Sequence, residues 1–286
     1  MSPPATQEAG SDFDFSEEDF ERVRGLIHSH AGIALSSSKR QLVYSRLGRR
    51  LRTLGISSFG EYLDHLEGGG ADEWEAFTNA LTTNLTSFFR EAHHFPILAD
   101  HIERMAAQRT VTLWCSACST GEEPYSMAMT AVAQLGTMNP PVRILATDVD
   151  TNVLEKAQRG VYPAESAEKL PQGYARRFFL KGAGSHAGFM KVRPEIQRLI
   201  TFRPINLLHD SWPIRGPLDA IFCRNVMIYF DKPTQYGILR KFAPMLREDG
   251  LLFAGHSESF HHAADLFRLR GKTVYEAIPR ARGTRG

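Results

Sequence analysis

The chain has few cysteines, almost no net charge and no long apolar run. Its 286 residues include three cysteines, an odd number that argues against a disulfide framework and for a reducing compartment. A formal net charge of +2 is too small to indicate nucleic acid as a partner. No segment approaches the roughly 20 apolar residues of a membrane span, and residues 1–4 lack the features of a secretory signal. We therefore expect a cytoplasmic protein that binds no nucleic acid.

Two phosphate-binding signatures, G-x-x-x-x-G-K-[ST] and a complete G-x-G-x-x-G, are also missing. In their place an apolar run, residues 111–114, leads into small residues, then Gly121 and the acids Glu122 and Glu123. This pattern predicts a strand, a tight loop that a ligand can approach closely, and a helix start. The acids would repel a phosphate at that helix end. A cationic ligand such as S-adenosylmethionine (SAM) fits better, although an ordinary strand-to-helix turn is the alternative.

A second apolar run, residues 142–147, ends in Asp148. An acid at the tip of the second strand can accept hydrogen bonds from the ribose hydroxyls of an adenosine. Gly121 and Asp148 are separated by the length of one helix and one strand, as in a βαβ unit. The alternative for Asp148 is a helix N-cap, but Asp150 or Thr151 can take that role. The spacing therefore favours an adenosine-containing ligand.

The order of apolar and polar segments predicts an α/β protein preceded by a small helical domain. We expect a disordered tail at residues 1–11, a helical domain at 12–80, a linker at 81–109 that contributes to the cofactor site, and a catalytic domain at 110–286. An insert at residues 163–204 interrupts the alternation of strands and helices. Within it, we expect a small antiparallel sheet built from residues 176–181, 188–192 and 199–203.

Four segments of the chain resemble the chemoreceptor glutamate O-methyltransferases of the CheR type. They are Thr-Asn-Leu-Thr-Ser-Phe-Phe-Arg-Glu at 83–91, Cys-Ser-Thr-Gly-Glu-Glu-Pro-Tyr-Ser at 118–126, Ala-Thr-Asp-Val-Asp at 146–150 and Cys-Arg-Asn-Val-Met-Ile-Tyr-Phe at 223–230. They occur in the family's order, and the resemblance runs from about Phe13 to Ile278. It implies a doubly wound sheet like that of class I SAM-dependent methyltransferases, with a small antiparallel β insert, preceded by a small all-α domain.

The resemblance implies transfer of the methyl group of SAM to glutamate side chains of bacterial chemoreceptors. The products would be glutamate methyl esters, used in sensory adaptation, and S-adenosylhomocysteine (SAH). A glutamate with a pKa of about 4.3 is already ionised at pH 7, so the reaction needs neither a general base nor a metal. It needs collinear placement of nucleophile, methyl and sulfur. Two alternatives stay open: a SAM-binding signalling adaptor without turnover, and a methyltransferase for another protein or a small molecule.

The resemblance also assigns roles to individual residues. Arg90 would orient the substrate carboxylate, and Tyr229 would supply a hydroxyl beside it. The alternatives are a surface arginine and a core tyrosine with a satisfied hydroxyl. Glu122 would hold the methionine end of SAM, and Asp148 its ribose. The full cofactor set implied by the resemblance is Asn84, Thr86, Arg90, Glu122, Asp148, Asn206, Leu207, Arg224 and Asn225.

Basic residues concentrate in residues 39–52, which hold six of them and no acid. Projected on a helix, some of these residues form a stripe beside the apolar face. A solvated face is the alternative, but a stripe without acids on its own helix favours an acidic partner. The resemblance implies that this partner is the methylated helices of a receptor. The stripe is formed by Lys39, Arg46, Arg49 and Arg50, of which the three arginines are the candidate recognition residues.

The insert contains Gly182-Ala183-Gly184, whose glycines permit a tight hairpin. Family members with Gly-x-Gly in this small sheet bind a short peptide from the receptor's C-terminus, so the resemblance implies a peptide site at Gly182 and Gly184. An exposed sheet edge can accept such a strand. We expect a monomer that meets the membrane only through its receptors. Residues 255–259, Gly-His-Ser-Glu-Ser, imitate a nucleophile elbow, but the last residue is not glycine and no histidine follows in hydrolase order.

Overall fold

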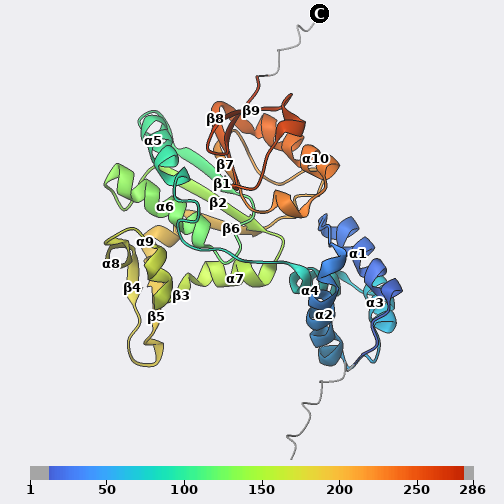
Figure 1. The fold of residues 1–286 in the computed structure, drawn as a ribbon. Coiled ribbons are helices and arrows are strands. Elements are labelled where there is room, and N and C mark those ends of the chain that lie inside the picture. The colour runs from blue at the N-terminus through green and yellow to red at the C-terminus, as the bar shows by residue number, and fades with distance from the viewer. Residues whose placement is uncertain (1–12, 280–286) are drawn as a thin grey trace, which may run out of the picture. The chain divides into compact units, whose positions relative to one another are not determined.

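The structure is a computed structural model that describes residues 13–279. It divides into two compact units, Met1–Thr82 and Thr83–Gly286, the first drawn in blue and cyan in Figure 1. The expected tail at residues 1–11 lies outside the described part of the chain. Within residues 13–279, no helix is long and apolar enough to cross a membrane.

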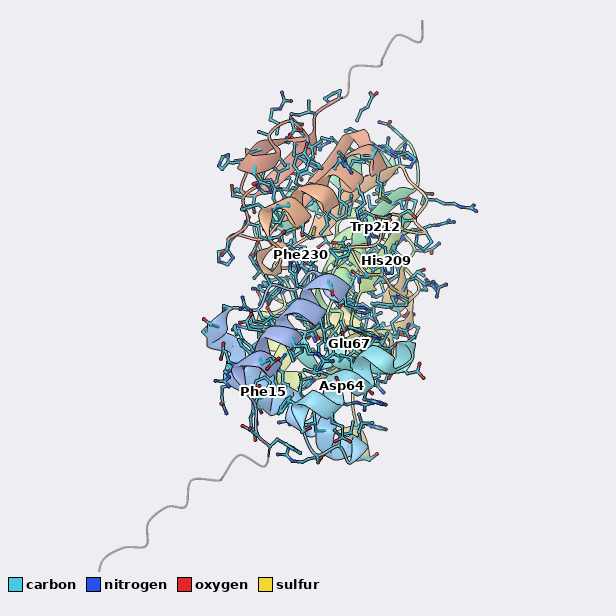
Figure 2. The ribbon with its side chains drawn as sticks, turned by 90° about the vertical axis from the view of Figure 1, so that its right-hand side faces the viewer. Phe15, Asp64, Glu67, His209, Trp212 and Phe230 are labelled. Atoms are coloured by element: carbon cyan, nitrogen blue, oxygen red, sulfur yellow. The ribbon has the colours of Figure 1, made fainter. Side chains whose placement is uncertain are left out.

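Residues 13–82 form four α-helices: α1 (Glu17–Ala31), α2 (Arg40–Leu54), α3 (Phe59–Gly68) and α4 (Ala71–Leu81). On the surface, Arg22 of α1 pairs with both Asp64 and Glu67 of α3, and Figure 2 labels these two acids. The expected all-α domain is confirmed. Its helices bury one apolar face each, and the core includes Phe20, Val23, Ile27, Val43, Leu47, Leu51, Phe59, Leu63 and Phe77.

A seven-stranded sheet forms the centre of the second unit, in the order β6-β2-β1-β7-β8-β10-β9. The first five strands in this order pair in parallel, and β10 and β9 add an antiparallel edge. The order changes direction between β1 and β7, which is where open α/β sheets place ligands. The strands are β1 (Val111–Cys115), β2 (Val142–Asp148), β6 (Ile200–Pro204), β7 (Leu218–Cys223), β8 (Leu246–Ala254), β9 (Phe267–Gly271) and β10 (Val274–Ala277).

Helices cover both faces of this sheet, as expected for a doubly wound fold (Figure 1). Leu113 and Cys115 of β1 pack in a core with α5 (His94–Ala106) and α6 (Glu122–Leu135). Trp114 points to the other face and packs in a second core with α10 (Lys232–Phe242). Successive side chains of a strand alternate between faces, so one apolar run supplies both cores. The sheet therefore holds the loops at its carboxyl ends on a rigid base.

The small sheet is antiparallel and has the order β3-β5-β4, with β3 at Val161–Pro163, β4 at Phe179–Lys181 and β5 at Phe189–Val192. The expectation that residues 199–203 belong to it is wrong. That segment is β6, which pairs in parallel with β2 and buries Ile200 and Phe202 in the core beneath α5 and α6. The third strand of the small sheet is β3, which follows α7 (Thr151–Arg159).

Short helical turns connect the longer elements in both units. Residues 174–178, expected in part as strand, form α8 before β4 begins. The turns are η1 (Ser37–Lys39), η2 (Ala164–Lys169), α8 (Tyr174–Phe178), η3 (Gly184–His186), α9 (Pro194–Gln197), η4 (Met227–Tyr229), η5 (Ala243–Met245) and η6 (His261–Ala263).

Candidate cofactor and catalytic site

The loop after β1 needs glycine at its last position. Gly121 has φ 98°, a left-handed conformation that other residues rarely adopt. A Cβ there would lie 2.8 Å from both Ala157 Cβ and Tyr162 Oη. The Tyr162 hydroxyl also donates a hydrogen bond to the carbonyl of Thr120 (2.7 Å). Helix α7 and strand β3 of the small sheet thus meet the loop closely, and the backbone of the loop is fixed.

Hydrogen bonds tie this loop to two neighbouring segments. The amide of Ser119 donates to Asp148 (2.8 Å), and its hydroxyl donates to the carbonyl of Asn84 (3.1 Å). The side-chain amide of Asn84 donates to Asp150 (2.8 Å). The segment 83–91 therefore lies beside the carboxyl ends of β1 and β2. The structure brings the first cofactor motif, the second strand's acid and Asn84 together.

Asp148 is buried at the end of β2, with 7% of its surface exposed. One carboxylate oxygen accepts from Ser119, and the other accepts from the amide of Asp150 (3.0 Å). Burial raises the pKa of Asp148 to about 6, against these backbone hydrogen bonds, which lower it. Asp150 is the N-cap of α7, where it accepts from Asn152 and Val153. Asp148 therefore is not the cap, and its spare lone pairs remain for a ligand.

The first turn of α6 carries two acids in different surroundings. Burial raises the pKa of Glu122, whose carboxylate accepts from the hydroxyl of Thr120 (2.6 Å). Glu123 also has its pKa raised by burial, and it pairs with Arg224 (2.8 Å) and accepts from the thiol of Cys115 (3.2 Å). Glu122 is thus the acid of this turn without a cationic partner in residues 13–279.

Arg224 joins the segment 83–91 to the end of β7. It is 4% exposed, and its guanidinium pairs with Glu123 and with Glu91 (3.3 Å) and donates to the carbonyl of Arg90. The resemblance assigned Arg224 to the cofactor wall, and the structure adds that its guanidinium is engaged with protein groups. Its position fixes the backbone of Arg90.

Glu91 lies at the centre of a polar cluster. It accepts from Asn225 (3.2 Å) and faces His256 (3.1 Å). Burial alone would raise the pKa of Glu91, but the hydrogen bond with His256 and the charge of Arg224 lower it to about 2. The ligand atoms of Glu91, His93 and His94 lie within 4.8 Å of one another, so they could in principle hold a metal. Arg224 already balances the charge of Glu91, which favours an ion-pair network.

The two candidate catalytic side chains lie on the segments that Arg224 connects. Arg90 is half-buried and donates to the carbonyl of Leu85 (2.9 Å), which leaves further guanidinium donors for another ligand. Tyr229 is the half-buried last residue of η4, four residues after Asn225. Asn225 itself has φ 57°.

The remaining cofactor candidates follow the same edge of the sheet. Asn206 lies just beyond β6, where its side chain accepts from the amide of Leu208 (2.9 Å) and its carbonyl accepts from Trp212 (3.1 Å). Leu207 is buried, and Thr86 is half-buried in the segment 83–91. Candidate cofactor residues thus follow β1, β2, β6 and β7.

Sequence reasoning missed Glu258, which lies four residues after β8 and is 4% exposed. Its carboxylate accepts hydrogen bonds from four backbone amides, those of Gly255, Asn225, Val226 and Met227. From the sequence, the segment 255–259 was considered only as an imitation of a nucleophile elbow, and its acid was given no role. The available signal was an acid three residues after the glycine that follows a strand.

In the first unit, the candidate recognition arginines differ in their surroundings. Arg49 is exposed, whereas Arg46 donates to the carbonyls of Ala80 (3.2 Å) and Thr82 (2.5 Å). Arg50 pairs with the buried Glu73 of α4 through two nitrogens (2.9 and 2.5 Å). The sequence argument considered only acids on the same helix, and it therefore overlooked this pair.

In the insert, Gly182 and Gly184 shape the connection between β4 and β5. A Cβ on Gly182 would lie 2.0 Å from the carbonyl oxygen of His186, and Gly184 has φ 57°. Gly184 is exposed and begins the turn η3. Both glycines are thus required by the backbone.

A doubly wound sheet with a small-residue loop after β1 and an acid ending β2 is the arrangement of an α/β protein that binds an adenosine-containing ligand. Residues 84–276 match the CheR methyltransferase SAM binding domain, and residues 18–82 match the CheR methyltransferase all-alpha domain. The chain belongs to the CheR methyltransferase family and is a SAM-dependent methyltransferase.

Named relatives are similar over nearly their whole length. The chain is 52% identical over 275 residues to chemotaxis protein methyltransferase 2 of Pseudomonas aeruginosa, covering 96% of this chain and 98% of that protein. It is 53% identical over 261 residues to the chemotaxis protein methyltransferase of Escherichia coli, covering 91% of each. The similarity therefore extends over both units.

Proposed function

We propose that this protein methylates glutamate side chains of bacterial chemoreceptors, with SAM as methyl donor and SAH as product. The observation that carries the proposal is the joint match of both units to one methyltransferase family, together with the loop at Gly121 and Asp148. The enzyme acts in the cytoplasm as a monomer, without a metal and without binding nucleic acid. It reaches the membrane only through its receptors.

The residues around Gly121 fit SAM. A side chain at position 121 would collide with Ala157 and Tyr162, so the glycine lets the loop pack against these residues and fixes the loop backbone. Asp148 would accept from the ribose, and Glu122 would face the amino group at the methionine end. Asn84, Thr86, Asn206, Leu207 and Asn225 complete the proposed cofactor site. When bound, SAM supplies an electrophilic methyl group.

Arg90 and Tyr229 would position the substrate carboxylate. Arg90 keeps free donors beyond its bond to Leu85, and Arg224 fixes its backbone. A carboxylate is nucleophilic when ionised, so these groups orient it and remove no proton. Rate then depends on holding the attacking oxygen in line with the methyl carbon. We assign the remaining contribution of this site to the exclusion of water.

Receptor recognition would use both units. Arg49, with Arg46 and Arg50 beside it, offers positive charge to the acidic methylated helices of a receptor. The strand β4 lies at an edge of the small sheet, next to the Gly182–Gly184 turn. An extended C-terminal receptor peptide can add to such an edge. This second contact would raise the local concentration of enzyme near its substrate.

The test is incubation with methyl-labelled SAM and receptor-rich membranes. We expect base-labile label in receptor protein, as for a carboxyl methyl ester, with no effect of a chelator. Binding of SAH without any label in protein would favour the adaptor. Label confined to soluble proteins or to small molecules would favour the other substrate class.

A further inference from the structure

The segment after β8 folds back so that a buried carboxylate fills a ring of backbone amides. Glu258 accepts through Oε2 from Gly255 (2.5 Å) and Asn225 (3.0 Å). It accepts through Oε1 from Val226 (3.0 Å) and Met227 (2.8 Å). Three of these donors are consecutive residues of the loop after β7. The carboxylate therefore takes the place that an anionic ligand takes in a backbone nest.

The two loops approach each other at backbone distance. A Cβ on Gly255 would lie 2.4 Å from Nδ2 of Asn225 and 2.9 Å from Oε2 of Glu258. Asn225 has φ 57°, a left-handed conformation that asparagine adopts more readily than most residues other than glycine. The four charge-assisted hydrogen bonds to Glu258 then hold the two loops together.

The side chain of Asn225 is held by a second carboxylate. Its Nδ2 donates to Oε1 of Glu91 (3.2 Å), which follows Arg90 in the chain. A carboxylate only accepts, so the amide group must turn its nitrogen toward Glu91. The Oδ1 atom then remains as an acceptor for a donor group of the cofactor.

We propose that Glu258 is a positioning residue for methyl transfer. Through the amides of residues 225–227 it fixes Asn225, a proposed cofactor residue, and the start of η4, which ends at Tyr229. Glu91 sets the side-chain direction of the same asparagine. This inference rests on the proposed function for Tyr229, and its cofactor part can be measured without a receptor.

Glu258→Gln is the sharpest variant. It keeps the shape of the side chain but replaces one oxygen with an NH2 group, which would face backbone donors. We expect SAH affinity to fall at least about tenfold, since a buried donor loses its acceptor. We also expect the KM for SAM to rise and kcat to fall. The matched control is Glu248→Gln, at an exposed glutamate of β8, which should behave as wild type.

Three measurements distinguish a positioning role from a role in folding. They are calorimetry with SAH, initial rates, and a titration of active sites that gives the folded fraction. A variant that only unfolds more readily would show fewer active molecules with unchanged KM and unchanged SAH affinity, and this result overturns the proposal. If the wild-type enzyme does not label receptors, this result counts against receptors as the substrate. SAH binding would still test the role of Glu258, because this measurement needs no receptor.

Hydrogen exchange of the wild-type protein gives a test that needs no variant. The amides of Asn225, Val226 and Met227 should exchange at least about tenfold more slowly than those of the exposed turn η3, because Glu258 holds them. Fast exchange at all three amides in the folded protein would show that the carboxylate does not hold this loop, and would overturn the proposal even if Glu258→Gln failed to fold.

Discussion

Asp148→Asn should remove most of the affinity for SAH while the protein stays folded, although the new NH2 group would face one of the two backbone amides bound by Asp148. The carboxylate of Asp148 is 7% exposed and is held by two backbone amides, so its direction is already set. A charge-assisted hydrogen bond from a ribose hydroxyl is worth about 1.5–3 kcal/mol. Loss of one such bond should therefore weaken binding about 10- to 150-fold.

The pH dependence of SAH binding to the wild-type protein is a second test of the role of Asp148. Burial raises the pKa of Asp148 to about 6 in the ligand-free protein. The proposed ribose contact needs the ionised form, so affinity should be nearly full at pH 7 and above, half of that at about pH 6, and lower still at more acidic pH. At pH 5 about one carboxyl in ten is ionised, so SAH should bind about tenfold more weakly than at pH 7.

Isothermal calorimetry with SAH between pH 5 and pH 8 measures both the effect of the variant and the pH dependence, and thermal unfolding checks the fold. The control is Asp100→Asn, at an exposed aspartate of α5. Burial also raises the pKa values of Glu122 and Glu258, so the loss of affinity at low pH belongs to Asp148 only if it disappears in Asp148→Asn. A variant with wild-type affinity, or with the same pH dependence, would refute the ribose role.

Three further predictions concern catalysis and recognition. Arg90→Ala should lower kcat by at least about tenfold at saturating SAM with little change in unfolding temperature; a wild-type rate would exclude its role in orientation. Arg49→Glu should slow receptor methylation at low salt and leave stability unchanged. Arg50→Gln should instead lower the free energy of unfolding by roughly 1–3 kcal/mol, because Glu73 loses its partner. Unfolding and rate measurements that show the opposite pattern would contradict both predictions. Deletion of residues 182–184 should abolish binding of a C-terminal receptor peptide in a titration and leave SAH affinity unchanged; surviving peptide binding would place that site elsewhere.

The main sheet was predictable because its first strands are continuous apolar runs that end in small or acidic residues. The small sheet was predicted with one wrong strand. Its strands β3 and β4 each have three residues, too few to show a period. Alternation in β6 shows that Ile200 and Phe202 share a face, but it does not say which sheet they join. The pairing of β6 with β2 depends on contacts between residues that are far apart in the chain.

The site was predictable to the extent that its chemistry is local in sequence. Gly121 and the acid that ends β2 stand in recognisable spacing, and the structure joins them through Ser119. The partner of Arg50 is 23 residues away on another helix, and the donors bound by Glu258 include Asn225, 33 residues before it. Neither contact leaves a pattern in the sequence, because each depends on how separate elements pack.

The site carries several carboxylates of its own, although the proposed substrate is also a carboxylate. Glu91 and Glu123 both pair with Arg224, and Glu258 is held by four amides. A carboxylate whose lone pairs already accept charge-assisted hydrogen bonds is a weaker nucleophile, since attack on a methyl group must disrupt those bonds. Under the proposed function, a substrate glutamate would arrive from water and would be oriented by Arg90, without the several fixed bonds of these internal acids. In Glu91, Glu123 and Glu258, the lone pairs that would attack a methyl group are thus already engaged by protein donors.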